Sequence, residues 1–169
     1  KGESVEYLAT THTYGYMKDP ENPKRHWVVD EEAAAVVRQI FALSIDGYGP
    51  SQIARKLKEA KVDCPTAHWE KQGRNFPVKA PDDPYAWHPR TVSGILERQE
   101  YLGRMVNFKS HRQSYKNKKK IDNSPEDWIV FENAHESIID TETFARVQEL
   151  RKNKRRPTKI GKTNMFSGI

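Results

Sequence analysis

The sequence predicts an α+β fold, namely a mainly helical domain with a helix-turn-helix-like pair and a small antiparallel sheet. Apolar residues recur at helical spacing in residues 31–46, 51–60 and 90–97. Aromatic and branched residues alternate with polar ones around the turn "DPENPK" and again in residues 101–109. Pro, Gly and Asp residues separate these segments, so we expect several short elements.

A β-hairpin is predicted first. Tyr14, Tyr16, Trp27 and Val29 lie on either side of the turn and would supply its buried side. Residues 1–12 have no clear period, so we expect them to precede the domain as a linker.

The next segment predicts a long amphipathic helix over residues 31–46. Asp30 precedes it as a helix cap, and Gly47 follows it as a stop. Its buried face consists of Val37, Ile40, Phe41 and Ser44, which follow the i, i+3, i+4, i+7 pattern.

A shorter helix is predicted over residues 51–60, where Ile53, Ala54 and Leu57 face the core. Residues 62–86 contain four Pro and one Gly. Because no long helix or strand can run through so many breakers, we expect an extended surface loop there.

The stretch "WHPRTVSGILERQEYLG" predicts a third helix, over residues 90–97. Pro89 suits the first helical position, and Val92, Ile95 and Leu96 form a narrow apolar stripe. Small, hydroxyl and arginine residues occupy the faces that the stripe leaves free.

The last third predicts a strand in residues 101–109, a basic loop of about 17 residues over 110–126, and a second strand in residues 127–133. Asp140 would cap a final helix, whose inward residues are Phe144, Val147 and Leu150.

Charge is distributed unevenly along the chain. Residues 1–103 hold fourteen Lys and Arg against fifteen Asp and Glu, whereas residues 104–169 hold fifteen against eight. The net charges are therefore −1 and +7, within a total of +6. Such asymmetry favours a polyanionic partner, because a local positive field attracts phosphates while the acidic part stays solvated.

The single cysteine, Cys64, excludes an intrachain disulfide and a cysteine-based zinc site within this chain. We expect a cytoplasmic, bacterial or phage-encoded protein that does not cross a membrane, since no apolar run reaches the length of a span. The chain starts at Lys1 without Met and stops at "NMFSGI", so we expect a fragment.

The helices over residues 51–60 and 90–97 resemble the two halves of a helix-turn-helix, in which the second helix enters the major groove of DNA. Packing of the apolar stripe is expected whether or not the helix binds DNA. The outer face favours DNA, because arginine can contact guanine through two hydrogen bonds and hydroxyl groups can contact phosphates. Basic clusters in the loop and tail would add phosphate contacts, although these do not separate DNA from RNA. The residues predicted to contact DNA are Arg90, Thr91, Ser93, Arg98, Arg104, Lys109, Arg112, Lys116, Lys118, Lys119, Lys120, Arg151, Lys154, Arg155 and Arg156.

No catalytic residue, cofactor or metal site is predicted. The six histidines form neither a His-x-x-x-His nor a His-Glu-x-x-His pair, and no Gly-x-Ser-x-Gly elbow, phosphate loop or dinucleotide fingerprint is present.

The order of four segments resembles the large serine recombinases, which include phage serine integrases and transposon recombinases. The matching stretches are "YGYMKD", "WVVDEEAAAVVRQIFALSIDGYGPSQIARKL", "WHPRTVSGILERQEYLGRMV" and "NAHESIIDTETFARVQELR". Residues 66–86 depart from the family pattern, because they are longer than the usual short link.

This resemblance implies a recombinase domain over residues 13–151, which binds double-stranded DNA at an attachment site. It implies that residues 1–12 lead from a missing catalytic domain, which carries the serine nucleophile, and that residues 152–169 form a basic linker toward a missing zinc ribbon. Other recombinase subunits would be met through the missing domains.

Two alternatives remain open at the level of sequence. One is a free-standing nucleic-acid-binding regulator or RNA-binding module, which would need its own dimer interface or stacking platform. The other is a metal-dependent hydrolase that uses His and Asp residues, which a metal-dependent nicking assay would detect.

Overall fold

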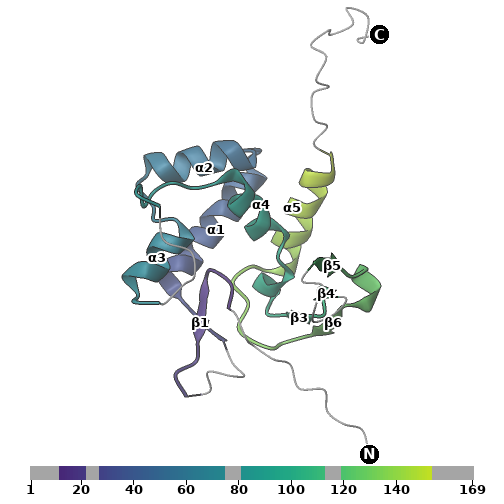
Figure 1. The fold of residues 1–169 in the computed structure, drawn as a ribbon. Helices are drawn as coiled ribbons and strands as arrows, with labels where there is room; N and C mark the ends of the chain where they lie inside the picture. The colour runs from purple at the N-terminus through teal and green to yellow at the C-terminus, as the bar shows by residue number, and fades with distance from the viewer. Residues whose placement is uncertain (1–11, 22–26, 75–80, 113–118, 154–169) are drawn as a thin grey trace, which may run out of the picture.

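The computed structural model describes residues 12–21, 27–74, 81–112 and 119–153. Figure 1 shows the course of the chain. The elements are, in order, β1 (Tyr16–Lys18), β2 (Trp27–Val29), α1 (Glu31–Ile45), α2 (Pro50–Glu59), α3 (Pro65–Lys71), α4 (Pro89–Glu97), the 3₁₀ helix η1 (Gln99–Leu102), β3 (Met105–Asn107), β4 (Ser110–Arg112), β5 (Lys120–Asp122), the 3₁₀ helix η2 (Pro125–Asp127), β6 (Ile129–Phe131) and α5 (Thr141–Asn153).

The predicted α+β fold is confirmed, with helices in the majority. In the described residues the strands form three antiparallel pairs, β1 with β2, β3 with β6, and β4 with β5. The small sheet expected from the sequence is therefore divided into separate ladders.

Helix α1 is at the centre of the helical layer and packs against α2, α4 and α5 (Figure 1). Its predicted cap and face are confirmed, because the Asp30 side chain accepts a hydrogen bond from the Ala33 N–H, and Val37, Ile40 and Phe41 are buried. The acidic residues of the first turn suit the positive end of the helix dipole.

The N-terminal hairpin belongs to the same core. Tyr16 is fully buried, and its hydroxyl donates to the Glu136 carbonyl at 2.8 Å. Its ring stacks on that of Tyr101, whose hydroxyl donates to the Tyr14 carbonyl at 2.8 Å. Residues 14–16 and 101 are thus joined although they are far apart in sequence.

The predicted pair of helices packs together, since α2 contacts α4 directly. In both helices the predicted apolar stripe is buried. The connection between them is not the extended surface loop that we expected, because Pro65–Lys71 forms α3. Pro65 occupies the first turn, where a missing N–H has no cost, and the side chains of Ala67 and His68 are buried.

The predicted strand over residues 101–109 is wrong in its first half. Tyr101 lies in η1, and the strand begins only at Met105. Gly103 separates them with φ +79°, and a Cβ there would stand 2.6 Å from the His135 carbonyl oxygen. Only glycine tolerates this backbone and this approach, so the chain turns before it extends.

The predicted loop over residues 110–126 is also wrong in part. It contains β4, β5 and η2, and the described residues of β4 and β5 pair from Ser110 with Asp122 to Arg112 with Lys120. A polar hairpin of this kind has weak alternation of hydrophobic and polar residues, which is why the pattern did not reveal it.

The final helix is confirmed. Asp140 accepts a hydrogen bond from the Thr143 N–H at 2.8 Å, and Val147 is completely buried. The helix extends to Asn153, two residues past the predicted end of the domain at 151.

Candidate nucleic-acid interface

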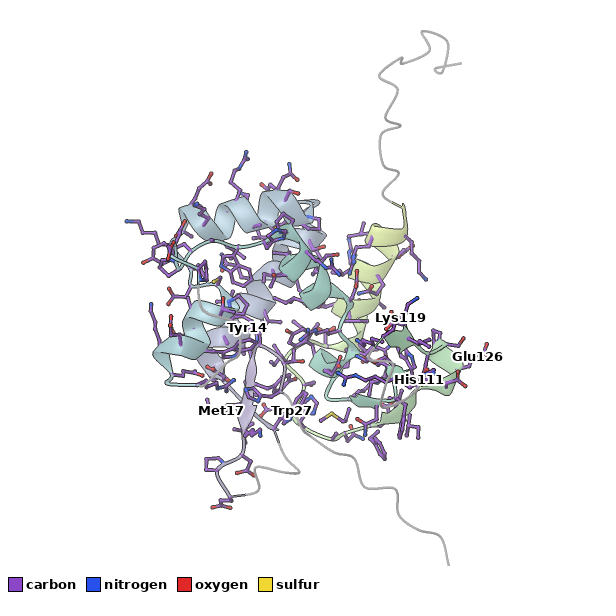
Figure 2. All side chains as sticks on the ribbon, in the orientation of Figure 1. Tyr14, Met17, Trp27, His111, Lys119 and Glu126 are labelled. Carbon is purple, nitrogen blue, oxygen red and sulfur yellow. The ribbon has the colours of Figure 1, made fainter. Side chains whose placement is uncertain are left out.

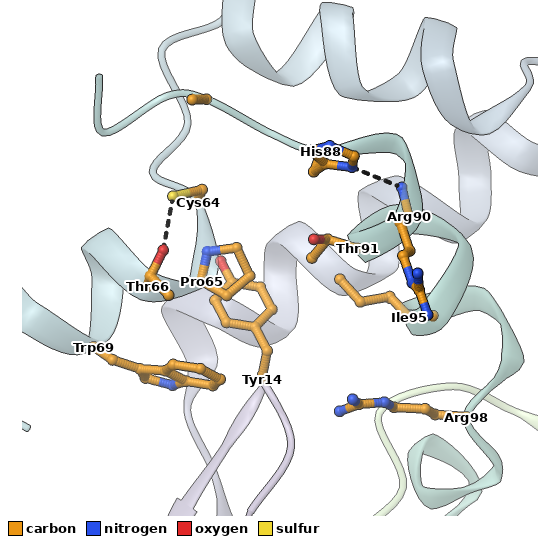
Figure 3. Close-up of a pocket in the computed structure, with 12 residues that line it drawn as sticks. Tyr14, Cys64, Pro65, Thr66, Trp69, His88, Arg90, Thr91, Ile95 and Arg98 are labelled. Atoms are coloured by element: carbon orange, nitrogen blue, oxygen red, sulfur yellow. Dashed lines mark hydrogen bonds between the residues drawn. The ribbon is translucent and has the colours of Figure 1, made fainter. Parts of the chain in front are cut away.

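An open groove of about 690 Å³ lies between α3 and α4. Figure 3 shows Arg90 and Arg98 on one side of it, Trp69 on the other, and Tyr14 between them. None of the described residues that line this groove is acidic. They are Tyr14, Cys64, Pro65, Thr66, Trp69, Ala86, His88, Arg90, Thr91, Gly94, Ile95 and Arg98.

The α4 wall is set by its helix start. The Trp87 indole N–H donates to the Val62 carbonyl at 3.0 Å, which anchors the chain just before the helix. His88 is the N-cap, and its Nδ1 accepts from the Arg90 N–H at 3.5 Å. Because Val92 and Leu96 are buried behind the helix, Arg90 is exposed at the groove.

The α3 wall is held by a buried polar network. His68 Nε2 lies 2.8 Å from Asp30 Oδ2, and Gln72 Nε2 donates to the same oxygen at 2.8 Å. Burial would raise the pKa of Asp30, but hydrogen bonds from His68, Gln72 and the Ala33 N–H lower it below the ordinary value. Asp30 is therefore ionised near neutral pH, and it joins α3 to the start of α1.

Tyr14 forms the floor of the groove. Its ring makes edge contacts with His68, Trp69 and Trp87, at centroid distances of 5.6, 6.3 and 5.9 Å. Burial, followed by the charge of Asp30, raises the pKa of Tyr14 well above its usual value. The phenol therefore stays neutral, and it places no negative charge in the groove.

Three of the predicted contact residues line the groove, namely Arg90, Thr91 and Arg98. Arg98 is the C-cap of α4, and its guanidinium donates to Thr13 Oγ1 at 3.0 Å. Ser93 is not among the lining residues. Its hydroxyl donates to Glu97 Oε1 at 3.2 Å and accepts from Arg151 at 3.1 Å.

Four of the six other predicted basic contacts that the structure describes have acidic neighbours. Arg104 Nε lies 2.7 Å from Glu132 Oε2, and Lys109 Nζ lies 2.6 Å from Glu100 Oε1. Arg151 forms an ion pair with Glu97. Lys120 Nζ is 3.9 Å from Asp122 Oδ1, a loose contact between exposed groups. Arg112 and Lys119 are exposed on the β4–β5 hairpin, and Figure 2 shows Lys119 well apart from Tyr14.

Arginines fall into two classes according to these contacts. Arg38, Arg55, Arg104 and Arg151 are each paired with a glutamate. Within the described ranges, no acidic side chain forms an ion pair with the other class, which consists of Arg74, Arg90, Arg98, Arg112 and Arg146. Arg90 and Arg98 line the groove, and Arg74 makes a cation–π contact with Trp69 on its wall, so positive charge is left available there.

Five predicted contacts lie outside the described residues, namely Lys116, Lys118, Lys154, Arg155 and Arg156. In the part of the chain that the structure describes, no three His, Cys, Asp or Glu side chains are grouped to hold a metal ion. No described helix combines the length and apolarity of a membrane span.

The sequence reasoning missed α3 and the residues that it brings to the groove, above all Trp69. The signal was present, because Pro65 and Gly73 bracket a helix-length segment in the order that helix starts and stops prefer. It was overlooked because the surrounding prolines suggested a continuous loop.

The family model described as Recombinase matches residues 31–154. The chain belongs to the Recombinase family. The resemblance to the large serine recombinases is thereby confirmed. Residues 13–30 lie outside the match, although their hairpin packs into the same core.

Individual relatives are more distant. The chain is 30% identical over 81 residues to "Uncharacterized protein YefB" of Bacillus subtilis (strain 168), which covers 48% of this chain and 27% of that protein. Two solved structures, "Crystal Structure of a LSR-DNA Complex" and "Sequence Requirements of the Listeria innocua prophage attP site", each cover 86% of this chain at 20% identity with a TM-score of 0.45. The chain covers 33% and 44% of those two chains, and a TM-score of this size does not establish a shared fold.

Proposed function

We propose that this chain is the DNA-binding domain of a site-specific serine recombinase and positions the enzyme on its attachment site. Cutting and rejoining of strands would belong to a catalytic domain outside this chain. The partners would be double-stranded DNA and other recombinase subunits, in a bacterial or phage-infected cytoplasm. The domain limits of 13–151, with linkers on both sides, are part of the same proposal.

The observation that carries the proposal is the groove wall formed by α4. Arg90 and Arg98 are found there without acidic partners among the described residues, next to Thr91 and Gly94, which have little bulk. A helix with this face can approach a base edge closely, and guanidinium groups match the paired acceptors of guanine. Helix α2 packs on α4 and would hold it in the major groove.

Binding would divide between two kinds of contact. Residues of α4 would read bases, whereas basic residues of the β4–β5 hairpin and the C-terminal segment would contact phosphates and set the register. Both kinds are needed, because phosphate contacts supply affinity without sequence information.

The test is binding of the chain to duplexes from candidate element ends and to scrambled duplexes, at several salt concentrations. If about six phosphates are neutralised, affinity should fall roughly a thousandfold between 50 and 200 mM salt. Arg90→Ala should cost about 1–3 kcal/mol on the cognate site and relax preference at one base pair.

The control is Arg38→Ala, which removes an arginine that is paired with Glu31 on α1. It should leave both affinity and preference unchanged. Salt-independent binding of the wild-type chain would contradict the proposal, and an equal loss on both duplexes for Arg90→Ala would make α4 a phosphate clamp.

A further inference from the structure

The C-terminal end of α3 has a geometry that the proposed base contacts of α4 do not explain. Gly73 adopts φ +71°, its N–H donates to the Glu70 carbonyl, and the Arg74 N–H donates to the Trp69 carbonyl at 3.0 Å. This is the paired hydrogen-bond pattern of a Schellman stop. It fixes the backbone of Arg74 relative to Trp69.

The two side chains meet as a result. The Arg74 guanidinium lies over the Trp69 ring, 5.9 Å from its centroid, and Trp69 lines the groove opposite α4 (Figure 3). A cation–π contact with an indole leaves N–H groups of the guanidinium free to donate hydrogen bonds.

Arg74 forms no ion pair within the described residues. The charge of Asp30 acts on it from a distance, while the hydrogen bonds of Asp30 Oδ2 go to His68 and Gln72. The charge of Arg74 also acts on the neighbouring His12. Burial and then the charge of Arg74 lower the pKa of His12 to about 4. A half-buried guanidinium that is not paired directly with a carboxylate favours an anionic ligand.

We propose that Trp69 and Arg74 form a second DNA contact on α3, with Arg74 on a phosphate and the Trp69 indole against the adjoining deoxyribose. One strand would then run along the groove, between α3 and α4. This inference rests on the proposed function, and it adds a helix that the sequence pattern did not assign to binding. A sugar–phosphate chain suits the groove, because arginines lie on both walls and an aromatic surface lies between them.

The main test compares Arg74→Gln with Arg55→Gln in the full chain. Arg55 is the matched control, since it is exposed on α2 and paired with Glu59. Arg74→Gln should weaken binding about tenfold on cognate and scrambled duplexes alike and lower the salt slope by about one. Arg55→Gln should leave both unchanged. Arg74→Lys should keep the slope while it loses part of the affinity, because lysine lacks the planar guanidinium group and its several N–H donors.

A second measurement does not depend on affinity. DNA should quench tryptophan fluorescence in the wild-type chain but much less in Trp69→Phe. The control is Trp128→Phe, which removes a tryptophan just before β6 and should keep the quenching. Thermal unfolding of each variant checks that the fold is intact.

The outcomes separate the two proposals. If Arg90→Ala weakens binding while Arg74→Gln and Trp69→Phe behave as wild type, the α3 contact is wrong and the proposed function stands. If the wild-type chain binds no duplex, the proposed function fails. If inorganic phosphate, compared with chloride at the same ionic strength, binds through Arg74 while Arg74→Gln leaves DNA binding unchanged, the site takes a small anion and the DNA contact is wrong.

Discussion

The groove between α3 and α4 and the region around β3–β6 and α5 both carry arginines, but they use them differently. Beside the groove, Arg74, Arg90 and Arg98 form no ion pair with the described residues. Across the domain, Arg104 and Arg151 are each paired with a glutamate. Basic residues that look equivalent in sequence therefore differ in how much charge they offer to a ligand.

The α5 side shows what a paired arginine does instead. Gln148 Nε2 donates to the Leu96 carbonyl at 2.6 Å, and Arg151 donates to Ser93 and pairs with Glu97. Leu96 belongs to the last turn of α4, whose carbonyls have no partner within the helix. The last turns of α5 thus cap and hold α4, so Arg151 acts on the geometry of the groove from behind.

The largest effect is expected where the groove wall is held. Asp30→Ala removes the cap of α1 and the acceptor of His68 and Gln72, and should lower the free energy of unfolding by about 2–4 kcal/mol. The matched variant is Asp140→Ala, which removes only a cap and should cost about 1 kcal/mol. Urea unfolding of both variants measures the difference.

The pH dependence of Asp30 has a definite sign. Because the pKa of Asp30 is lower when folded, its contribution is present above the unfolded value near pH 4 and is lost as pH falls through the folded pKa. The gap between wild type and Asp30→Ala should therefore narrow below about pH 4. A gap that is constant with pH would show that the charge of Asp30 does not hold α3.

Arg151 tests the difference between the two classes of arginine. Arg151→Ala should reduce stability by about 1–2 kcal/mol, because Glu97 and Ser93 lose a charged donor. Its salt slope for DNA should stay at the wild-type value, unlike that of a phosphate contact. A slope lower by one, with unchanged stability, would place Arg151 on DNA as the sequence predicts.

Gly94 tests how closely a ligand approaches α4. A Cβ at this position would meet nothing within 4 Å, so the fold itself does not require glycine. Gly94→Ala should raise stability by about 0.5–1 kcal/mol through helix propensity. It should weaken DNA binding if the duplex contacts the backbone there, whereas Gln39→Ala on the exposed face of α1 should not. Unchanged affinity would mean that DNA stays clear of this turn.

The smallest effect separates two arginines of the β-rich region. Arg112→Gln should lower the salt slope by about one, because no described carboxylate is paired with it. Arg104→Gln should lower the slope by less than half as much, since Glu132 already offsets its charge. Equal slopes for the two variants would mean that acidic neighbours do not decide which arginines bind DNA. In a Glu132→Gln background, Arg104→Gln should lower the salt slope by nearly as much as Arg112→Gln does.

Local patterns in the sequence were enough for most of the helical layer. Caps and helical periodicity are local signals, because they act over a few residues. They include the caps Asp30 and Asp140, the apolar face of α1 and the helix start at Pro89. The resemblance to serine recombinases was readable for the same reason, since it rests on the order of such segments. Helix α3 could have been found from Pro65 and Gly73, but neighbouring prolines obscured it.

Long-range contacts decided the rest. The turn at Gly103 depends on the His135 carbonyl, and the division of the arginines depends on glutamates up to 54 residues away, as for Arg151 and Glu97. Sequence alone thus determined which residues form the face of α4 and that the last third of the chain is basic. Only tertiary structure decided which cations remain available, because burial and ion pairing are set by neighbours in space.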